Sequence, residues 1–192
     1  MEKDDLKTGY EIIVIGGSAG SLEVILPMLE RVTTLRFPIV VVLHRKSATD
    51  SLLIEVLSQR SAMNVKEVEE KEPVRKGIVY LAPPDYHLLV ENDRTFSLDY
   101  SEKINFSRPS IDVTFESVAS VYGEAAVAIL LSGGNADGVE GLKTIKAAGG
   151  MCVVQDPGTA EIAFMPAYAV NNATIDLVVA GGDFAGFINS LR

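Results

Sequence analysis

Residues 12–45 read IIVIGGSAGSLEVILPMLERVTTLRFPIVVVLHR, and this stretch decides the fold class. It contains an apolar run at 12–15, apolar residues at helical spacing (Leu22, Ile25, Leu26 and Leu29), and a second apolar run at 39–43. An apolar run without polar alternation is typical of a strand buried on both faces, as in parallel sheets covered by helices. The stretch therefore predicts a β-α-β unit of an α/β protein.

The same alternation continues along most of the chain. It predicts strands at 125–131, 151–155 and 175–179, and helices at 49–60, 138–148, 166–172 and 183–191, with a further helix that begins near Pro109 and has Ser107 as a possible cap. Between residues 63 and 100 the pattern changes to short β-rich pieces at 65–68, 77–82, 87–91 and 95–99. Turn residues separate these pieces, so we expect residues 63–100 to form an antiparallel insertion on the sheet edge.

Length and composition exclude several classes of protein. The 192 residues fit one domain, and 47% apolar residues support a sizeable core. A net charge of -9 opposes binding to nucleic acid or anionic lipid, which needs clustered Lys and Arg. The single cysteine, Cys152, favours a reducing compartment, so we expect the cytoplasm. Residues 1–10 lack a secretory signal, and no window approaches the roughly 18 apolar residues of a membrane span, so we expect no membrane insertion.

The loop after the first predicted strand reads Gly16-Gly17-Ser18-Ala19-Gly20 and matches G-x-S-x-G. In this motif, small flanking residues let a serine sit exposed on a tight strand-to-helix turn, so Ser18 is a candidate nucleophile. A glycine-rich turn that only packs a helix on the sheet, or binds a phosphate, remains an alternative. The dinucleotide-binding version of the motif is disfavoured, because serine stands at two of its glycine positions.

A serine nucleophile needs a base and an acid, and the chain has only two histidines, His44 and His87. His44 is favoured because it ends the buried strand next in sequence to that of Ser18. Asp137 also follows a predicted strand, where it can orient the imidazole, cap a helix, or do both. No histidine follows Asp137, so the order of the three residues excludes the α/β-hydrolase fold. Asp156 and Glu161 could suggest a metal site, but solvated loop carboxylates are commoner, and we expect no metal.

Six short motifs in register together resemble the catalytic domain of chemotaxis protein-glutamate methylesterases, the CheB family. They are residues 15–20, Leu43-His44, Tyr80-Leu81-Ala82-Pro83-Pro84 with His87, Ser107-Arg108-Pro109-Ser110-Ile111-Asp112, Leu130-Leu131-Ser132-Gly133 with Asp137-Gly138, and Gln155-Asp156 followed by Met165-Pro166. The resemblance spans nearly the whole chain after Glu11. It implies a doubly wound, mostly parallel sheet with an antiparallel edge hairpin. We accordingly expect an N-terminal tail over residues 1–10 and a single methylesterase-like catalytic domain over residues 11–192.

The resemblance also implies a function. Ser18, His44 and Asp137 would form a catalytic triad that hydrolyses glutamyl methyl esters on the cytoplasmic domain of methylated chemoreceptors, and some family members also deamidate receptor glutamines. No cofactor is implied. The oxyanion would need backbone N–H donors, which we expect near the Ser18 turn, at Ala19, and in the Gly133-Gly134 loop.

Two departures from the family pattern leave an alternative open. The family commonly has Met and then Gly-Asn-Asp-Gly in the loop that here reads Gly134-Asn135-Ala136-Asp137-Gly138, and Thr commonly stands where this chain has Ala19. Only residues 1–10 precede the first predicted strand, so we expect no receiver domain, and activity that is constitutive or controlled by a regulator acting in trans. The alternative is a weakly active or inactive module that binds the receptor or a signalling partner.

Overall fold

The computed structural model describes residues 9–33, 36–45 and 50–192, with only the backbone at residues 50 and 51. In this part of the chain, seven parallel strands form one sheet in the order β3-β4-β2-β1-β7-β8-β9. They are β1 (Ile12–Gly17), β2 (Ile39–Leu43), β3 (Asn64–Glu67), β4 (Ile78–Leu81), β7 (Ala126–Leu130), β8 (Met151–Gln155) and β9 (Leu177–Val179). The predicted parallel sheet is confirmed.

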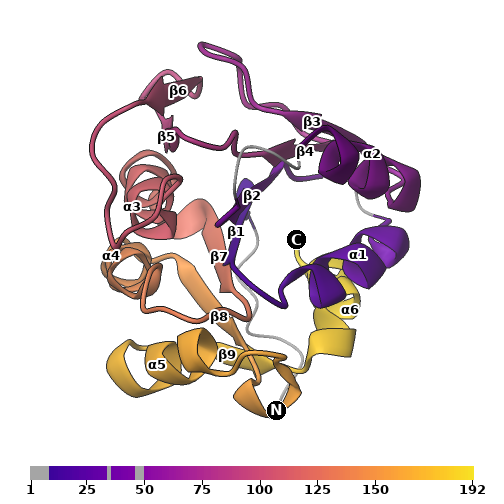
Figure 1. The fold of residues 1–192 in the computed structure, drawn as a ribbon, viewed down its shortest axis with the longest axis vertical. Coiled ribbons are helices and arrows are strands. Elements are labelled where there is room, and N and C mark those ends of the chain that lie inside the picture. Colours follow the sequence, from indigo (N-terminus) through magenta and orange to yellow (C-terminus); the bar gives the residue numbers. More distant parts are fainter. Residues whose placement is uncertain (1–8, 34–35, 46–49) are drawn as a thin grey trace.

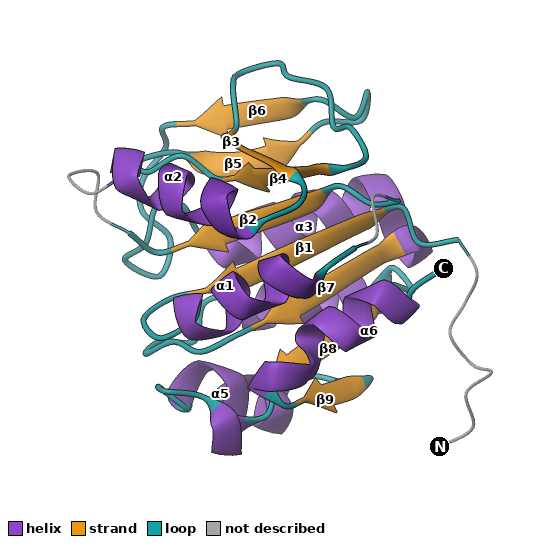
Figure 2. Cartoon of the chain, turned by 90° about the vertical axis from the view of Figure 1, so that its right-hand side faces the viewer, coloured by secondary structure: helices purple, strands orange, loops and turns teal. Residues whose placement is uncertain are grey.

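Helices cover both faces of the sheet (Figures 1 and 2). One face carries α1 (Leu22–Arg31), α2 (Asp50–Arg60) and α6 (Phe184–Ser190), and the other carries α3 (Ile111–Tyr122), α4 (Val139–Ala147) and α5 (Phe164–Asn172). Alternate β1 residues enter opposite cores: Ile13 packs with α1 and α6, and Ile12 packs with α3 and α4. The central strands are thus buried on both sides, as their continuous apolar runs predict.

The region between residues 63 and 100 is only partly antiparallel. β5 (His87–Val90) and β6 (Phe96–Asp99) form an antiparallel hairpin, a separate two-stranded sheet that packs on α3. The prediction of a wholly antiparallel insertion was wrong for β3 and β4, which pair parallel and extend the main sheet beyond β2. The loop between them returns the chain to the same end of the sheet, and the completely buried Val79 and Tyr80 suit an interior parallel strand.

The strand order reverses beside β1, and this reversal positions the site. From β1 the chain forms β2 and then β3 at the edge, inserts β4 between β2 and β3, and then returns to place β7 against the other side of β1. Ligands of open α/β sheets bind beyond the carboxyl ends of the strands at such a reversal. Ser18 follows β1 and residues 131–138 follow β7, so both loops lie at this point.

Two smaller findings complete the fold. The cap of α3 is Ser110, whose hydroxyl accepts from the Val113 N–H, so the prediction of Ser107 was wrong. Among the described residues, no helix is long and apolar enough to cross a membrane.

Candidate active site

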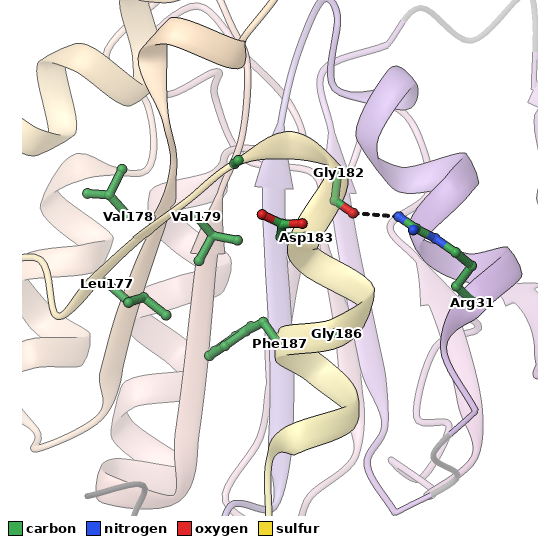
Figure 3. A pocket seen from close by; sticks show the side chains of 9 residues that line it. Arg31, Leu177, Val178, Val179, Gly182, Asp183, Gly186 and Phe187 are labelled. Carbon is green, nitrogen blue, oxygen red and sulfur yellow. Dashed lines mark hydrogen bonds between the residues drawn. The ribbon is translucent and has the colours of Figure 1, made fainter. Parts of the chain in front are cut away.

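Two open clefts lie on the surface of the described residues. The one at the β9 edge encloses about 500 Å3 between β9 and α6 (Figure 3). Its charged lining residues are Arg31 and Asp183, and the Arg31 guanidinium is engaged by the Gly182 carbonyl at 2.5 Å. The other cleft, also about 500 Å3, is lined by Ser18 and His44 and has apolar walls from α1 and α2. Of these two clefts, the second has both a hydroxyl and an imidazole among the described residues of its lining.

Ser18 is held on a rigid turn after β1. Its N–H donates to the Ser132 carbonyl at 2.9 Å, and its own carbonyl accepts from the Ser21 hydroxyl at 2.6 Å. Gly133 closes the turn from the β7 side, where a Cβ would lie 3.0 Å from the Ser18 Cβ. The backbone of Ser18 is therefore fixed between two neighbouring strand ends, while its side chain faces the cleft.

His44 follows β2 directly, and its N–H donates to the Gly17 carbonyl at 3.2 Å, which extends the β1–β2 pairing. Its ring Nε2 lies 2.7 Å from Asp137 Oδ2 and therefore carries the proton, because a carboxylate can only accept. The other ring nitrogen, Nδ1, is left as an acceptor, 3.5 Å from Asn135 Nδ2. Between the two described residues Ser18 and His44, no side-chain hydrogen bond forms in this conformation.

Asp137 is completely buried, and its carboxylate is surrounded by donors. Besides His44, these are the Ser110 hydroxyl at 3.0 Å and the backbone N–H groups of Ile111 at 2.7 Å, Asp112 at 3.1 Å and Gly138 at 3.1 Å. Burial alone would raise the pKa of Asp137. The hydrogen bonds from His44, Ile111 and Asp112 outweigh burial and lower the pKa to about 2. The carboxylate is therefore ionised at neutral pH.

Asp137 contacts the N-terminus of α3 and does not cap α4, the helix that follows it in the chain. The cap of the following helix, α4, is Gly138, which has a φ of 94° and no side-chain cap bond. Asp137 instead accepts the first backbone N–H groups of α3, a helix that precedes it in the chain by one strand. Favourable interaction with the positive end of α3 adds to the hydrogen bonds that keep this carboxylate charged.

A second buried carboxyl lies beside Asp137. Asp112 accepts from the Gly141 N–H at 2.8 Å and from Asn105 Nδ2 at 3.0 Å, and the same amide nitrogen lies 3.4 Å from Asp137 Oδ1. Burial, together with the nearby Asp137 charge, raises the pKa of Asp112 to about 6. Sequence reasoning assigned no role to Asn105 or Asp112. Asp112 could have been selected, because it ends one of the motifs that carry the family resemblance.

The other histidine has a structural role. His87 is completely buried, its Nδ1 accepts from the Ser110 N–H at 3.1 Å, and its Nε2 donates to the Glu102 carbonyl at 2.9 Å. Both ring nitrogens are thus used by backbone groups. His87 holds the start of α3, which in turn positions Asp137.

The three oxyanion candidates differ in what their backbone N–H groups already do. The Gly133 N–H donates to the Ile162 carbonyl at 3.2 Å. The N–H groups of Ala19 and Gly134 have no acceptor among the described residues. A Cβ at Gly134 would also meet no atom within 4 Å, so this part of the loop is open to an incoming group.

The remaining candidates are explained by local structure. The Asp156 carboxylate caps the short turn at Pro157–Thr159 by accepting from the Gly158 N–H, and Glu161 packs against Gly20. Among the described residues, no group of three or more His, Cys, Asp or Glu side chains could hold a metal ion. Burial raises the pKa of Cys152 to about 12, so this buried thiol stays protonated at neutral pH and is not a candidate nucleophile.

The family of the chain follows from comparison with known proteins. The model of the CheB methylesterase family matches residues 13–188. The chain belongs to the CheB methylesterase family. A putative protein-glutamate methylesterase/protein-glutamine glutaminase of Leptospira interrogans is 48% identical over 174 residues, which cover 89% of each chain. A protein-glutamate methylesterase/protein-glutamine glutaminase of Thermotoga maritima is 36% identical over 175 residues, 88% of this chain and 50% of the relative.

The crystal structure of the Thermotoga maritima CheB methylesterase catalytic domain superposes with a TM-score of 0.85 at 34% identity, covering 94% of this chain and 98% of that one. The family and the fold predicted from the sequence are therefore confirmed, and so is the enzyme class, a methylesterase-type carboxylic ester hydrolase.

Proposed function

We propose that this chain is a serine hydrolase that removes methyl groups from glutamyl methyl esters on the cytoplasmic domain of methylated chemoreceptors, and so acts in the cytoplasm. The observation that carries the proposal is the 2.7 Å hydrogen bond between His44 and Asp137 in the cleft that Ser18 lines. Deamidation of receptor glutamines is a second reaction of the same site, because it differs only in the group that leaves the same carbonyl carbon.

In the proposed mechanism, His44 Nδ1 is the base. Nε2 keeps its proton for Asp137, so Nδ1 is the nitrogen that accepts the Ser18 proton as the hydroxyl oxygen attacks the ester carbonyl. Rotation of the Ser18 hydroxyl toward Nδ1 completes the pair, since catalytic hydrogen bonds of free enzymes often tighten only when substrate binds. Asp137, ionised because its pKa is about 2, then stabilises the imidazolium.

The tetrahedral intermediate collapses when His44 returns the proton to the departing oxygen. Methanol leaves, and an ester between Ser18 and the glutamyl carboxyl group remains. Water attacks this acyl-enzyme with His44 again as base, which frees the glutamate and restores the serine. Ala19 and Gly134 are the donors we assign to the oxyanion, because their N–H groups are not engaged by other described residues.

Methanol release from a methylated receptor fragment tests the proposal. Ser18→Ala should lower the rate by several powers of ten, because loss of one triad member removes most of the catalysis. Ser120→Ala, at an exposed serine on α3, is the matched control and should match wild type. Equal rates for wild type and Ser18→Ala would refute Ser18 as the nucleophile. A fluorophosphonate should label Ser18, and His44→Ala should abolish labelling. An inactive interaction module would not be labelled.

A further inference from the structure

Residues 104–107 form a tight turn between β6 and α3. Backbone hydrogen bonds join Ile104 and Ser107 in both directions, at 3.2 and 2.9 Å. The two central residues, Asn105 and Phe106, have φ angles of 50° and 61°. Paired positive φ angles are common where the sequence is Asn-Gly, so Phe106 stands where glycine is usual. A bulky side chain in this backbone conformation is strained, and such strain is concentrated at functional positions.

The inward side of this turn is fastened to the proposed active site. The Asn105 amide nitrogen lies 3.0 Å from Asp112 Oδ2 and 3.4 Å from Asp137 Oδ1. The segment that carries the turn runs from β6 past α3 toward α4 (Figure 1). Phe106, the next residue, therefore lies on a turn that Asn105 attaches to Asp112 and Asp137.

The outward side of the turn exposes apolar surface. Phe106 is 97% exposed, Tyr100 66% and Ile104 42%. The Tyr100 ring is held in place by the Arg108 guanidinium, 3.9 Å from its centroid, and by the Tyr86 ring at 5.5 Å. Aromatic and arginine side chains are enriched where proteins bind proteins, and a small set of them supplies most of the binding energy.

We propose that Phe106 is a specificity-determining residue that contacts the protein chain carrying the ester. The inference rests on the proposed function and adds the surface that selects the substrate. Phe106 does not line the cleft that contains Ser18 and His44, so an ester no larger than the reacting group does not reach it. A glutamyl ester within a polypeptide continues on both sides of the reacting carbonyl, and its neighbouring apolar side chains can pack on the exposed ring.

The test compares two substrates. One is a methylated receptor cytoplasmic fragment, assayed by methanol release, and the other is p-nitrophenyl acetate, a small ester. Phe106→Ala should lower kcat/KM for the receptor fragment about tenfold, the effect of one interface anchor residue. It should change kcat/KM for p-nitrophenyl acetate by less than about twofold. Phe106→Leu should keep most of the receptor activity. Val178→Ala, which truncates an exposed apolar residue on β9, should change neither.

The possible outcomes separate this proposal from the proposed function. If Phe106→Ala lowers both activities equally, the residue acts through the geometry of the site, and the proposal is wrong. If receptor activity is unchanged while wild type is active, the proposal is also wrong, and the proposed function stands. If wild type acts on neither substrate, the proposed function fails and the Phe106 proposal fails with it. Because Phe106 is almost entirely exposed, its truncation leaves the core intact.

Discussion

Replacement of Asp137 by asparagine should stop the proposed chemistry by moving one proton on His44. The two carboxylate oxygens of Asp137 are used differently. Oδ1 accepts from Ser110, Asp112, Gly138 and Asn105, and Oδ2 accepts from Ile111 and His44. An asparagine should keep its oxygen at the Oδ1 position, where four donors converge, and turn its NH2 group toward His44.

The NH2 group at the Oδ2 position forces His44 Nε2 to become an acceptor. The ring proton then moves to Nδ1, the nitrogen that must take the Ser18 proton, and the base is lost. A wrong tautomer, together with loss of the charge that stabilises the imidazolium, should lower kcat by about 10,000-fold, or about 5 kcal/mol of barrier. The Ile111 N–H also loses its acceptor, which should lower the free energy of unfolding by about 1–3 kcal/mol.

Such a loss of stability is smaller than the free energy of unfolding of most domains, so the variant should remain folded. The assay is kcat for methanol release, with folding checked by circular dichroism under the same conditions. Asp183→Asn makes the same chemical change at an exposed carboxylate and should leave kcat unchanged. A folded Asp137→Asn variant within about tenfold of wild type would refute the assigned roles of His44 and Asp137.

Three further predictions concern neighbouring residues. Burial raises the pKa of Asp112 from 3.8 to about 6, so the folded state binds the Asp112 proton more tightly than the unfolded state does. The stability that Asp112 contributes should be full below pH 4, and about 3 kcal/mol should be lost as pH rises through 6. In urea unfolding, the free energy of unfolding of Asp112→Asn should change less between pH 4 and pH 7 than that of wild type, because the Asp112 contribution is gone. Phe106→Asn should raise the Tm by about 2–4 °C, because asparagine tolerates a φ of 61°. An unchanged or lower Tm would show that the backbone of Phe106 is not strained. Gly133→Ala should lower kcat at least about tenfold, because its Cβ would lie 2.5 Å from Met165 Cε and 3.0 Å from Ser18 Cβ. Gly182→Ala, where the space is open, is the control.

Sequence patterns predicted the strands that bear the site, because a strand buried on both faces is apolar throughout. Those patterns do not show which strands pair. Residues 64–81 therefore looked antiparallel, although β4 lies between two parallel neighbours. Ser18, His44 and Asp137 could be selected because each follows a buried strand, and the carboxyl ends of parallel strands share one edge. Whether they act together remains a prediction, since Ser18 and His44 share a cleft without a hydrogen bond.

The contacts that tune the site lay beyond sequence reasoning because they join segments distant along the chain. Asp137 caps α3 rather than α4, which depends on how two helices pack on one face of the sheet. Asn105 reaches Asp112 and Asp137 only because its turn has left-handed backbone angles. No spacing rule links a turn before one helix to a carboxylate after the next strand.

Because Asp137 contacts both His44 and the first turn of α3, the catalytic competence of His44 is coupled to the packing of α3 on the sheet. If release of Asp137 from the amides of Ile111 and Asp112 weakens the binding of a compound to the His44–Asp137 pair, reciprocity requires that the compound stabilises those contacts to the same degree. Deuterium uptake at those two amides would then slow when an inhibitor occupies the Ser18 cleft, although the inhibitor touches neither. Conversely, a ligand that displaces the first turn of α3 from the sheet would remove the support of Asp137. Such a ligand would inactivate the enzyme and leave Ser18 accessible.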